Sequence, residues 1–413
     1  MGAEKGPPYL GATCRQGTTL TVSDEPLSIY LHIPFCRSRC AYCDFVTYAG
    51  LDDFIEPYVQ AVIQEINFIG SSLPPLTACT LYLGGGTPSI LAPVQVEAVI
   101  SACQLYFRLE AGAEITLEAN PGTVDLNKLI AFKSTGVNRL SLGVQSANEQ
   151  ELRLFGRQHT FAEAEEAFHQ ARRAGFDNIN VDLIYGIPGQ SRQSWRRSLE
   201  AVLAWQPEHV SLYCLSVEEG TPLALQIRQK SVPRPDPDLA ATLYDDARKR
   251  LAEAGYQQYE LSNWARPGYE CRHNQQYWLN KAYLGFGAGA HSSMYNVRYW
   301  NVTQVSEYIK RVRDAERDRN VLLPPAMEGY EIIGERLAMS ETLILGLRLV
   351  RDGVNKKEFC LRFGKSVDEV FGLALKQLEQ SRLLACQDEV LRLTEQAYLI
   401  SNQVFIRLLP DED

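Results

Sequence analysis

The feature that most constrains the fold of this chain is a regular alternation of short β-rich runs with helical patterns. Proline and glycine punctuate the helical patterns, as at Pro93 near a helix start and at Gly136 and Gly175 after helix ends. Strands that alternate with helices indicate βαβ units and a parallel sheet. Six units are fewer than the eight of a closed barrel, so we expect an α/β fold with a partial (β/α)6 TIM-like barrel. The expected strands span residues 28–33, 79–83, 114–119, 138–144, 178–184 and 209–214, and the expected helices span residues 52–69, 93–107, 125–134, 161–174, 191–204 and 237–254.

The chain around this alternation divides into further segments. Residues 1–26 are rich in Gly, Pro, Ser and Thr, which predicts a flexible leader before a barrel core of residues 27–255. Residues 256–320 mix aromatic residues with glycine, which predicts a β-rich extension that contains an HNxxY motif. This segment ends in a charge run, which is typical of a solvated helix end or linker. Residues 321–413 are expected to form a helical, winged-helix-like C-terminal domain.

The C-terminal segment carries both helical and hairpin patterns. After Pro324 and Pro325 we expect helices up to about residue 380, a hairpin at residues 383–393 and a last helix up to about Leu409. The chain has a formal net charge of −9 and a sequence pI near 5.4, whereas phosphate binding needs a basic surface. We therefore expect a packing or partner role for this domain, and no nucleic acid among the partners.

Targeting signals are not recognisable in the sequence. No apolar run reaches the length of a membrane span. The first residues lack the apolar centre of a secretory signal, and Glu4, Asp24 and Glu25 argue against a mitochondrial transit peptide. Ten cysteines in such a chain are expected to be reduced thiols. The expected location is the cytoplasm.

The sharpest motif is the cysteine run FCRSRCAYC, which directly follows the first predicted strand. Its spacing is CxxxCxxC and involves Cys36, Cys40 and Cys43. A structural zinc ion takes four ligands, and no fourth Cys or His stands at a zinc-finger spacing. Plain buried thiols need no such spacing. Three thiolates can hold three irons of a [4Fe–4S] cluster and leave the fourth iron open for another molecule, so we predict a cluster site.

Other polar or glycine-rich positions fall at the carboxyl ends of the predicted strands. The run GGGTP at residues 84–88 follows the second strand, where glycine lets the backbone approach a ligand closely. Glu118 and Gln145 end the third and fourth strands, Arg157 follows the fourth, and Asp182 lies in the fifth. Parallel α/β folds build ligand sites at this edge, and buried polar side chains are costly unless they bind something. For Arg157 or Asp182 alone, a structural ion pair is the commoner explanation.

These motifs together resemble a known family. The segments YLHIPFCRSRCAYCDF, LYLGGGTP, ITLEANPG, LSLGVQS, VDLIYGIPGQ and CRHNQQYW are similar to those of the radical S-adenosylmethionine (SAM) family of oxygen-independent coproporphyrinogen oxidases and their heme-chaperone relatives. The resemblance runs from about residue 28 through the C-terminal domain. It implies a [4Fe–4S] cluster whose open iron binds SAM. The SAM-binding residues that it implies are Tyr30, Tyr42, Gly85, Gly86, Thr87, Glu118, Gln145, Arg157, Asp182 and Ser216.

One position separates the oxidases from the chaperones within this family. The oxidases carry a fourth cysteine two residues after the third, and here that position is Phe45. The segment before the cluster motif is also short, as in the chaperones. We therefore expect a heme chaperone that binds heme, a [4Fe–4S] cluster and SAM. It would transfer heme to acceptor hemoproteins such as respiratory cytochromes.

The HNQQY segment offers candidate heme ligands. Its HNxxY pattern resembles a heme-binding motif proposed for the chaperones, and a neutral imidazole such as His273 is a good axial ligand, with Tyr277 beside it. His273 could equally be a core histidine with satisfied hydrogen bonds, and the Cys271 thiolate is a competing ligand. His32 and His291 flank the predicted site, and His291 could border the cluster-bound SAM instead.

Two other functions stay open from the sequence. One is oxygen-independent oxidative decarboxylation of coproporphyrinogen III by a 5′-deoxyadenosyl radical. The other is radical-SAM modification of RNA or protein, for which the acidic charge makes RNA the weaker substrate. If the acceptors are membrane-bound, a peripheral membrane contact is an open alternative, and the sequence also leaves a homodimer open.

Overall fold

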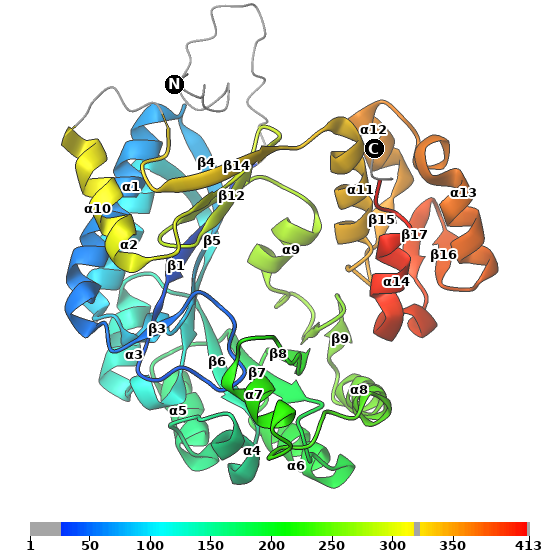
Figure 1. The fold of residues 1–413 in the computed structure, drawn as a ribbon, viewed down its shortest axis with the longest axis horizontal. Coiled ribbons are helices and arrows are strands. Elements are labelled where there is room, and N and C mark those ends of the chain that lie inside the picture. Colours follow the sequence, from blue (N-terminus) through cyan, green and yellow to red (C-terminus); the bar gives the residue numbers. More distant parts are fainter. Residues whose placement is uncertain (1–25, 318–322, 411–413) are drawn as a thin grey trace, which may run out of the picture.

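The computed structural model describes residues 26–317 and 323–410. The predicted leader therefore lies outside the described residues, apart from its last residue. One sheet of twelve strands organises the larger part of the molecule (Figure 1). Its strand order is β14-β13-β12-β11-β1-β4-β5-β6-β7-β8-β10-β9.

The centre of this sheet confirms the predicted partial barrel. Six strands in chain order pair in parallel with their neighbours, and helices cover their outer face (Figure 1). The strands are β1 (Leu27–Ile33), β4 (Leu76–Gly85), β5 (Phe107–Ala119), β6 (Arg139–Gln145), β7 (Ile179–Tyr185) and β8 (His209–Cys214). The helices are α1 (Ile55–Ser72), α2 (Pro93–Tyr106), α3 (Leu126–Ser134), α5 (Phe161–Arg173), α6 (Arg192–Ala204) and α8 (Pro237–Glu253).

The two faces of the curved sheet differ in chemistry, because successive strand residues point to opposite sides. Outward side chains such as Ile29 and Leu81 are fully buried in the main hydrophobic core beneath the helices. Alternate positions point inward and are largely polar. They form hydrogen bonds to one another, as buried polar groups must; Thr80 donates to Ser28, for example. The inside of the barrel is therefore a polar lining suited to hold a ligand.

The predicted extension continues the barrel sheet at both edges. β11 (Tyr283–Phe286) pairs in parallel with β1, which adds a seventh parallel strand. Antiparallel strands continue from it, and two short strands follow β8 at the opposite edge. These strands are β12 (His291–Met294), β13 (Val297–Asn301), β14 (Met327–Ile332), β10 (Asn263–Ala265) and β9 (Gln257–Gln258). The domain boundaries at residues 256 and 320 stay a prediction.

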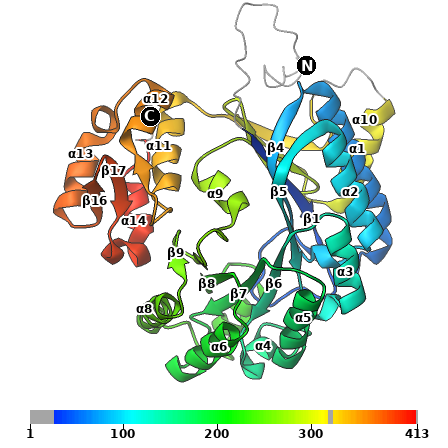
Figure 2. The same ribbon diagram turned by 180° about the vertical axis from the view of Figure 1, so that it is seen from behind.

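The two edges of the sheet do not meet, and helix α9 (Arg272–Trp278) lies between them (Figures 1 and 2). The sequence indicated β structure in this region. A helix forms because the Glu114 carboxylate of β5 accepts the backbone N–H groups of Arg272 and His273 at its first turn. Because Glu114 is far away in the sequence, no local pattern predicts this contact.

A further local prediction was wrong. β14 follows Pro324 and Pro325, where a helix was expected; among the described residues it pairs with β13 alone, and α11 (Glu335–Gly346) begins after it. The charge run at residues 311–320 was expected to be a helix end or linker, and α10 (Val305–Arg317) indeed ends within it. Val305, Tyr308 and Val312 of that helix are buried at helical spacing, so its charges occupy the outer face.

The C-terminal domain has a hydrophobic core of its own, around Leu343, Phe371 and Leu391. Helices precede a β-hairpin, as the winged-helix-like prediction required. The expected last helix is a 3-10 turn followed by a short α-helix. The elements after α11 are β15 (Val354–Asn355), α12 (Lys356–Phe363), α13 (Val367–Gln380), β16 (Leu384–Gln387), β17 (Val390–Leu393) and α14 (Ser401–Ile406). None of the helices in the described ranges is long and apolar enough to cross a membrane.

Candidate functional site

The three motif cysteines line one cavity of about 440 Å³ at the carboxyl ends of the barrel strands. Cys36 ends β2 (Phe35–Cys36), and Cys40 and Cys43 lie in the loop that follows. Hydrogen bonds to neighbouring loops hold this loop. The Ala41 N–H donates to the Phe155 carbonyl at 2.9 Å, and the Ala41 carbonyl accepts from a distant backbone N–H. All three thiols are half-buried and therefore accessible from the cavity.

Each cysteine sulfur has at least one polar neighbour. The Thr87 hydroxyl donates to Cys36 Sγ at 3.5 Å, and Arg157 Nη1 donates to Cys40 Sγ at 3.4 Å. The Thr47 hydroxyl lies 3.6 Å from Cys43 Sγ. Donors to the sulfurs stabilise thiolate ligands and tune the potential of an iron–sulfur cluster. Nowhere in the described ranges do three His, Cys, Asp or Glu side chains converge on the position of a single metal ion. Three half-buried thiols that line one cavity, each with a polar neighbour, are the ligand set that a [4Fe–4S] cluster needs.

The glycine loop lies beside the cysteines, as predicted. Gly86 N–H and Thr87 N–H donate to the carbonyls of Ile33 and Phe35, both at 2.9 Å, which ties this loop to the cysteine loop. A Cβ on Gly86 would lie 2.7 Å from the Phe35 carbonyl oxygen. Glycine is therefore required by the close approach of the two loops. Gly85, Gly86 and Thr87 all line the cavity.

Two predicted carboxylates stand on the barrel wall of the same cavity. Glu118 accepts from the Tyr82 hydroxyl at 2.8 Å and from the Gly85 N–H at 3.1 Å. Burial raises its pKa to about 7, and the nearby Asp182 adds to that effect. Asp182 accepts from Ser141 at 3.1 Å, and burial also raises its pKa. Neither carboxylate forms an ion pair with any residue that the structure describes, and both line the cavity.

Gln145 and Arg157 occupy the wall between the cysteines and β6. Gln145 adopts a left-handed φ of 70° at a bulge in the pairing with β7, a conformation that costs on the order of 1 kcal/mol outside glycine. Arg157 Nη2 donates to the Gly143 carbonyl, while Nη1 reaches Cys40. Both side chains line the cavity, as do Tyr42 and, at the exposed rim, Ser216.

The first cavity is also lined by residues that the sequence did not point to, and Arg139 is one of them. Arg139, the first residue of β6, is only 2% exposed and lines the cavity, and its Nε atom has no hydrogen-bond partner among the described residues. A charged residue at an inward position of a buried strand was the signal that could have revealed it. Its guanidinium adds a positive charge opposite the two carboxylates.

A second cavity, of about 500 Å³, adjoins the first. The two share Phe45, Asp44, Gly85 and Glu118 in their walls. Tyr30 lines this second cavity and not the first, and there it lies with Gly85 and Glu118 of the residues that the resemblance implies. The second cavity is largely aromatic; its remaining lining residues are His32, Val46, Tyr277, Tyr283, Gly289 and His291.

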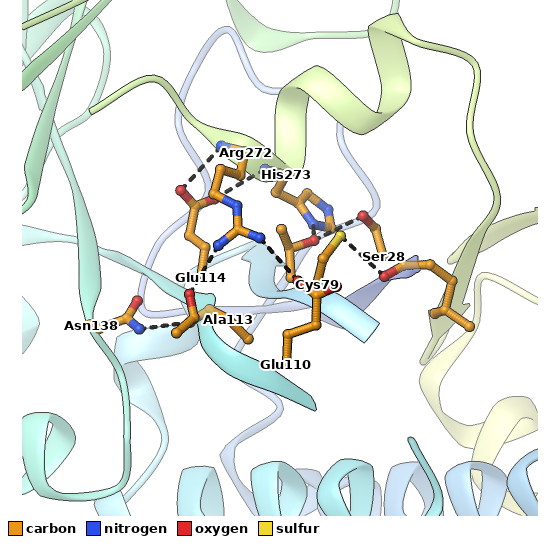
Figure 3. Close-up of polar contacts among 11 residues, drawn as sticks. Ser28, Cys79, Glu110, Ala113, Glu114, Asn138, Arg272 and His273 are labelled. Carbon is orange, nitrogen blue, oxygen red and sulfur yellow. Dashed lines mark hydrogen bonds and ion pairs between the residues drawn. The ribbon is translucent and has the colours of Figure 1, made fainter. Parts of the chain in front are cut away.

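The HNxxY motif forms α9, whose His273 lies deep in the barrel. His273 is 1% exposed, with Nδ1 at 2.8 Å from the Thr80 hydroxyl and Nε2 at 3.0 Å from the Tyr277 hydroxyl. Burial lowers its pKa to about 3, so the ring is neutral. Figure 3 shows Glu114 at the start of this helix, where its carboxylate binds the backbone of Arg272 and His273. Both ring nitrogens of His273 are therefore engaged inside the protein.

The competing ligand Cys271 is also enclosed. Its side chain is fully buried, and its thiol donates to Glu114 at 3.6 Å. Burial raises the pKa of this thiol to about 12. A thiolate ligand to heme iron would have to form against that shift. Asn274, the residue that follows His273, does line the first cavity.

Comparison with known proteins identifies the family of this chain. The model of the radical SAM superfamily matches residues 30–202, and that of the HemN C-terminal domain matches residues 335–400. The chain is 34% identical over 388 residues to the heme chaperone HemW of Lactococcus lactis, covering 94% of this chain and 98% of that protein. The chain belongs to the HemW family of radical SAM proteins. HemW of Bacillus subtilis is 35% identical over 380 residues, with 92% and 98% covered.

The HemW assignment agrees with the fold. The solved structure of HemN from Escherichia coli, described as a coproporphyrinogen III oxidase and radical SAM enzyme, superposes with a TM-score of 0.80. It covers 93% of this chain and 90% of that chain, at 23% sequence identity. Membership of the radical SAM superfamily implies a [4Fe–4S] cluster and SAM as cofactors. The three half-buried thiols and the adjoining polar cavity fit both groups.

Proposed function

We propose that this HemW-family protein is a heme chaperone, which binds heme beside a cluster and SAM site and passes it to acceptor hemoproteins. The observation that carries the proposal is the similarity to heme chaperones over nearly the whole chain. Phe45 supports it, because this position carries the fourth cysteine in the oxidases that the sequence resembles. Respiratory cytochromes are the acceptor class to test first.

The cluster and SAM site is part of the same proposal. Cys36, Cys40 and Cys43 would hold the cluster, which when bound supplies the electron that cleaves the sulfonium bond of SAM. Residues of this chain would orient SAM at the open iron. The glycine loop would approach its amino acid end, Glu118 would balance its ammonium group, and Arg139 or Arg157 its carboxylate. Tyr30, Tyr42, Gln145, Asp182 and Ser216 are the remaining proposed contacts.

The location and assembly belong to the proposal too. We place heme transfer in the cytoplasm, supported by nine described cysteines that are all free thiols, the form that a reducing compartment maintains. A peripheral membrane contact and a homodimer are further parts of the proposal. Cosedimentation with anionic vesicles and ultracentrifugation of the reconstituted protein test them.

The deciding experiment follows heme and porphyrin together. The anaerobically reconstituted protein receives SAM and a reductant, with either heme or coproporphyrinogen III. We expect stoichiometric heme binding, transfer of that heme to an apocytochrome, and no protoporphyrinogen. Turnover to protoporphyrinogen would make the protein an oxidase, and a failure to bind heme would end the chaperone proposal.

The cluster ligands give the first mutational prediction. Replacing Cys36, Cys40 and Cys43 together by Ala should remove the cluster, since no thiolate is left to hold its irons. The measurement is iron and sulfide content with the absorption spectrum after anaerobic reconstitution. The matched control is Cys360→Ala, an exposed thiol on α12, which should retain the full cluster. An intact cluster in the triple variant would refute the site.

A further inference from the structure

Arg139 is a buried positive charge for which the described residues provide no partner. Its side chain is almost fully buried and lines the first cavity, at the start of β6. Its guanidinium forms no hydrogen bond or ion pair with any residue that the structure describes, and its Nε atom is enclosed by protein. Burying a charge in this way is costly unless a group of opposite charge binds it. An anion that enters the cavity would supply the missing partner.

The carboxylates around Arg139 are bound to other groups. The Glu114 carboxylate, whose charge acts on Arg139, accepts two backbone N–H groups at the start of α9. Glu118 and Asp182 accept hydrogen bonds from neutral hydroxyl and amide groups of the barrel wall. None of the three lies within ion-pair distance of the guanidinium, so its donors remain available to a ligand.

Arg139 lies at the end of β6 that is far from the cysteine loop. It begins this strand, whereas Gln145 ends the strand in the wall beside the cysteines. A rise of about 3.3 Å per residue places their Cα atoms roughly 20 Å apart. Arg157, in contrast, donates to Cys40 Sγ at 3.4 Å. Because SAM would bind the cluster through its amino acid end, Arg157 is the arginine placed for the SAM carboxylate, and Arg139 is left for a different anion.

We propose that Arg139 binds a carboxylate of a molecule that enters the barrel, which for a heme chaperone is a propionate of heme. A guanidinium can hold a carboxylate through two parallel N–H···O bonds. Asn274 lines the same cavity, and its side-chain amide, which forms no hydrogen bond with the described residues, supplies a further donor. The inference rests on the proposed function, because it names the group by which the chaperone would hold heme.

The shape of heme suits this position. Its two propionates are narrow, flexible arms that extend from one edge of the macrocycle. The inner end of the cavity can therefore receive a carboxylate without enclosing the ring. The wall around Arg139 is polar, with Ser141, Asn180 and Ser211 among the lining residues, so it favours the charged arm over the apolar ring.

The stability of the empty protein separates this role from a purely structural one. If Arg139 stabilised the barrel, its replacement would lower the midpoint of thermal unfolding. We expect Arg139→Met to keep or raise the midpoint without ligand, because the variant removes a buried charge that has no partner. Arg197→Met, at an exposed position of the outer helix α6, is the matched control. A lower midpoint together with an unchanged affinity for hemin would overturn the proposal.

Hemin and its dimethyl ester separate the carboxylates from the rest of heme, since the ester keeps the iron and the macrocycle but lacks both negative charges. We expect Arg139→Met to bind hemin at least about tenfold more weakly than the wild-type protein, and both proteins to bind the ester with equal affinity. Arg197→Met should bind hemin as the wild-type protein does. Equal losses for hemin and its ester would indicate a disturbed cavity and would count against the proposal.

SAM binding to the reconstituted protein identifies the source of the carboxylate. Arg139→Met should bind SAM as tightly as the wild-type protein does. Weaker binding of SAM with unchanged binding of hemin would assign the carboxylate to SAM and refute the proposal. If the wild-type protein binds no hemin, the chaperone proposal fails and this inference with it. Hemin binding that does not depend on Arg139 refutes the inference alone.

Discussion

The charge of Glu118 decides what this residue can bind. Its carboxylate accepts hydrogen bonds from Tyr82 and Gly85, but burial and the nearby Asp182 raise its pKa to about 7. The group therefore changes its protonation state close to physiological pH. Arg139 is the positive group nearby that favours the ionised form. A ligand with an ammonium group would bind the carboxylate and not the carboxylic acid.

We predict that SAM binding weakens as the pH falls from 7.5 to 5.5. Below a pKa of about 7 the ionised fraction of Glu118 drops, and the affinity lost approaches tenfold per pH unit. Equilibrium binding of SAM to the reconstituted protein measures this dependence. Glu118→Gln should bind SAM more weakly at pH 7.5 and show a nearly flat profile. An unchanged pH dependence in that variant would assign the titration to another group.

Single residues also mark how far the sequence alone could go. The three cysteines, the glycine loop and Glu118 were predicted correctly to lie together, because the carboxyl ends of parallel strands share one edge. The engagement of both nitrogens of His273 could not be predicted, since its partner Thr80 lies on a distant strand. The position of Phe45 in the walls of both cavities could not be predicted either, because it depends on where the two cavities adjoin.

At the scale of elements, the buried Glu65 of α1 joins three other segments. It accepts from the Gly287 N–H at 2.9 Å, from Asn301 at 2.7 Å and from the Tyr308 hydroxyl at 2.6 Å. These partners lie in the loop after β11, at the end of β13 and on α10. The loop leads directly into β12 and His291. Glu65 therefore fixes the start of the strand that borders the second cavity.

We predict that Glu65→Ala lowers the free energy of unfolding by about 3 kcal/mol, because three buried donors lose their acceptor. Urea unfolding followed by circular dichroism measures this change. Glu97→Ala, at an exposed position of α2, is the control and should change the free energy by less than about 0.5 kcal/mol. A loss below about 1 kcal/mol for Glu65→Ala would show that water or neighbouring groups replace the carboxylate.

The elements that the sequence predicted are those with their own periodic pattern. Six strands and six helices of the barrel have long apolar faces, so local residues specify them. Helix α9 and strand β14 depend on partners elsewhere, namely Glu114 for the helix and β13 for the strand. Tertiary contacts of this kind cannot be predicted from the residues that are neighbours in sequence.

At the scale of the whole molecule, the C-terminal domain is joined to the barrel through charged and aromatic contacts. Arg348, just after α11, lies over the Trp278 ring of α9 at 4.4 Å. Its positive charge also faces Glu260, a fully buried carboxyl whose pKa burial raises to about 7. Arg351 forms a further ion pair with Glu270. The domain therefore contacts the same helix that fills the gap in the barrel.

We predict that Arg348→Met destabilises this junction by about 2 kcal/mol, because Glu260 loses its counter-charge and Trp278 loses its cation–π partner. Thermal unfolding followed by tryptophan fluorescence measures the effect. Arg407→Met, at an exposed position after α14, should leave the midpoint unchanged. Equal midpoints for both variants would mean that the Arg348 contacts do not stabilise the junction.

The open barrel gives α9 a role beyond the residues it carries. This short helix is wedged between two sheet edges that would otherwise be free to approach or separate, and it is fixed to β5 through Glu114 and to the C-terminal domain through Trp278. It acts as a spacer that sets the distance between these two edges, and so the width of the barrel. The width of the opening, and so the size of molecule that can enter, then depends on a helix that also lines both cavities through Asn274 and Tyr277.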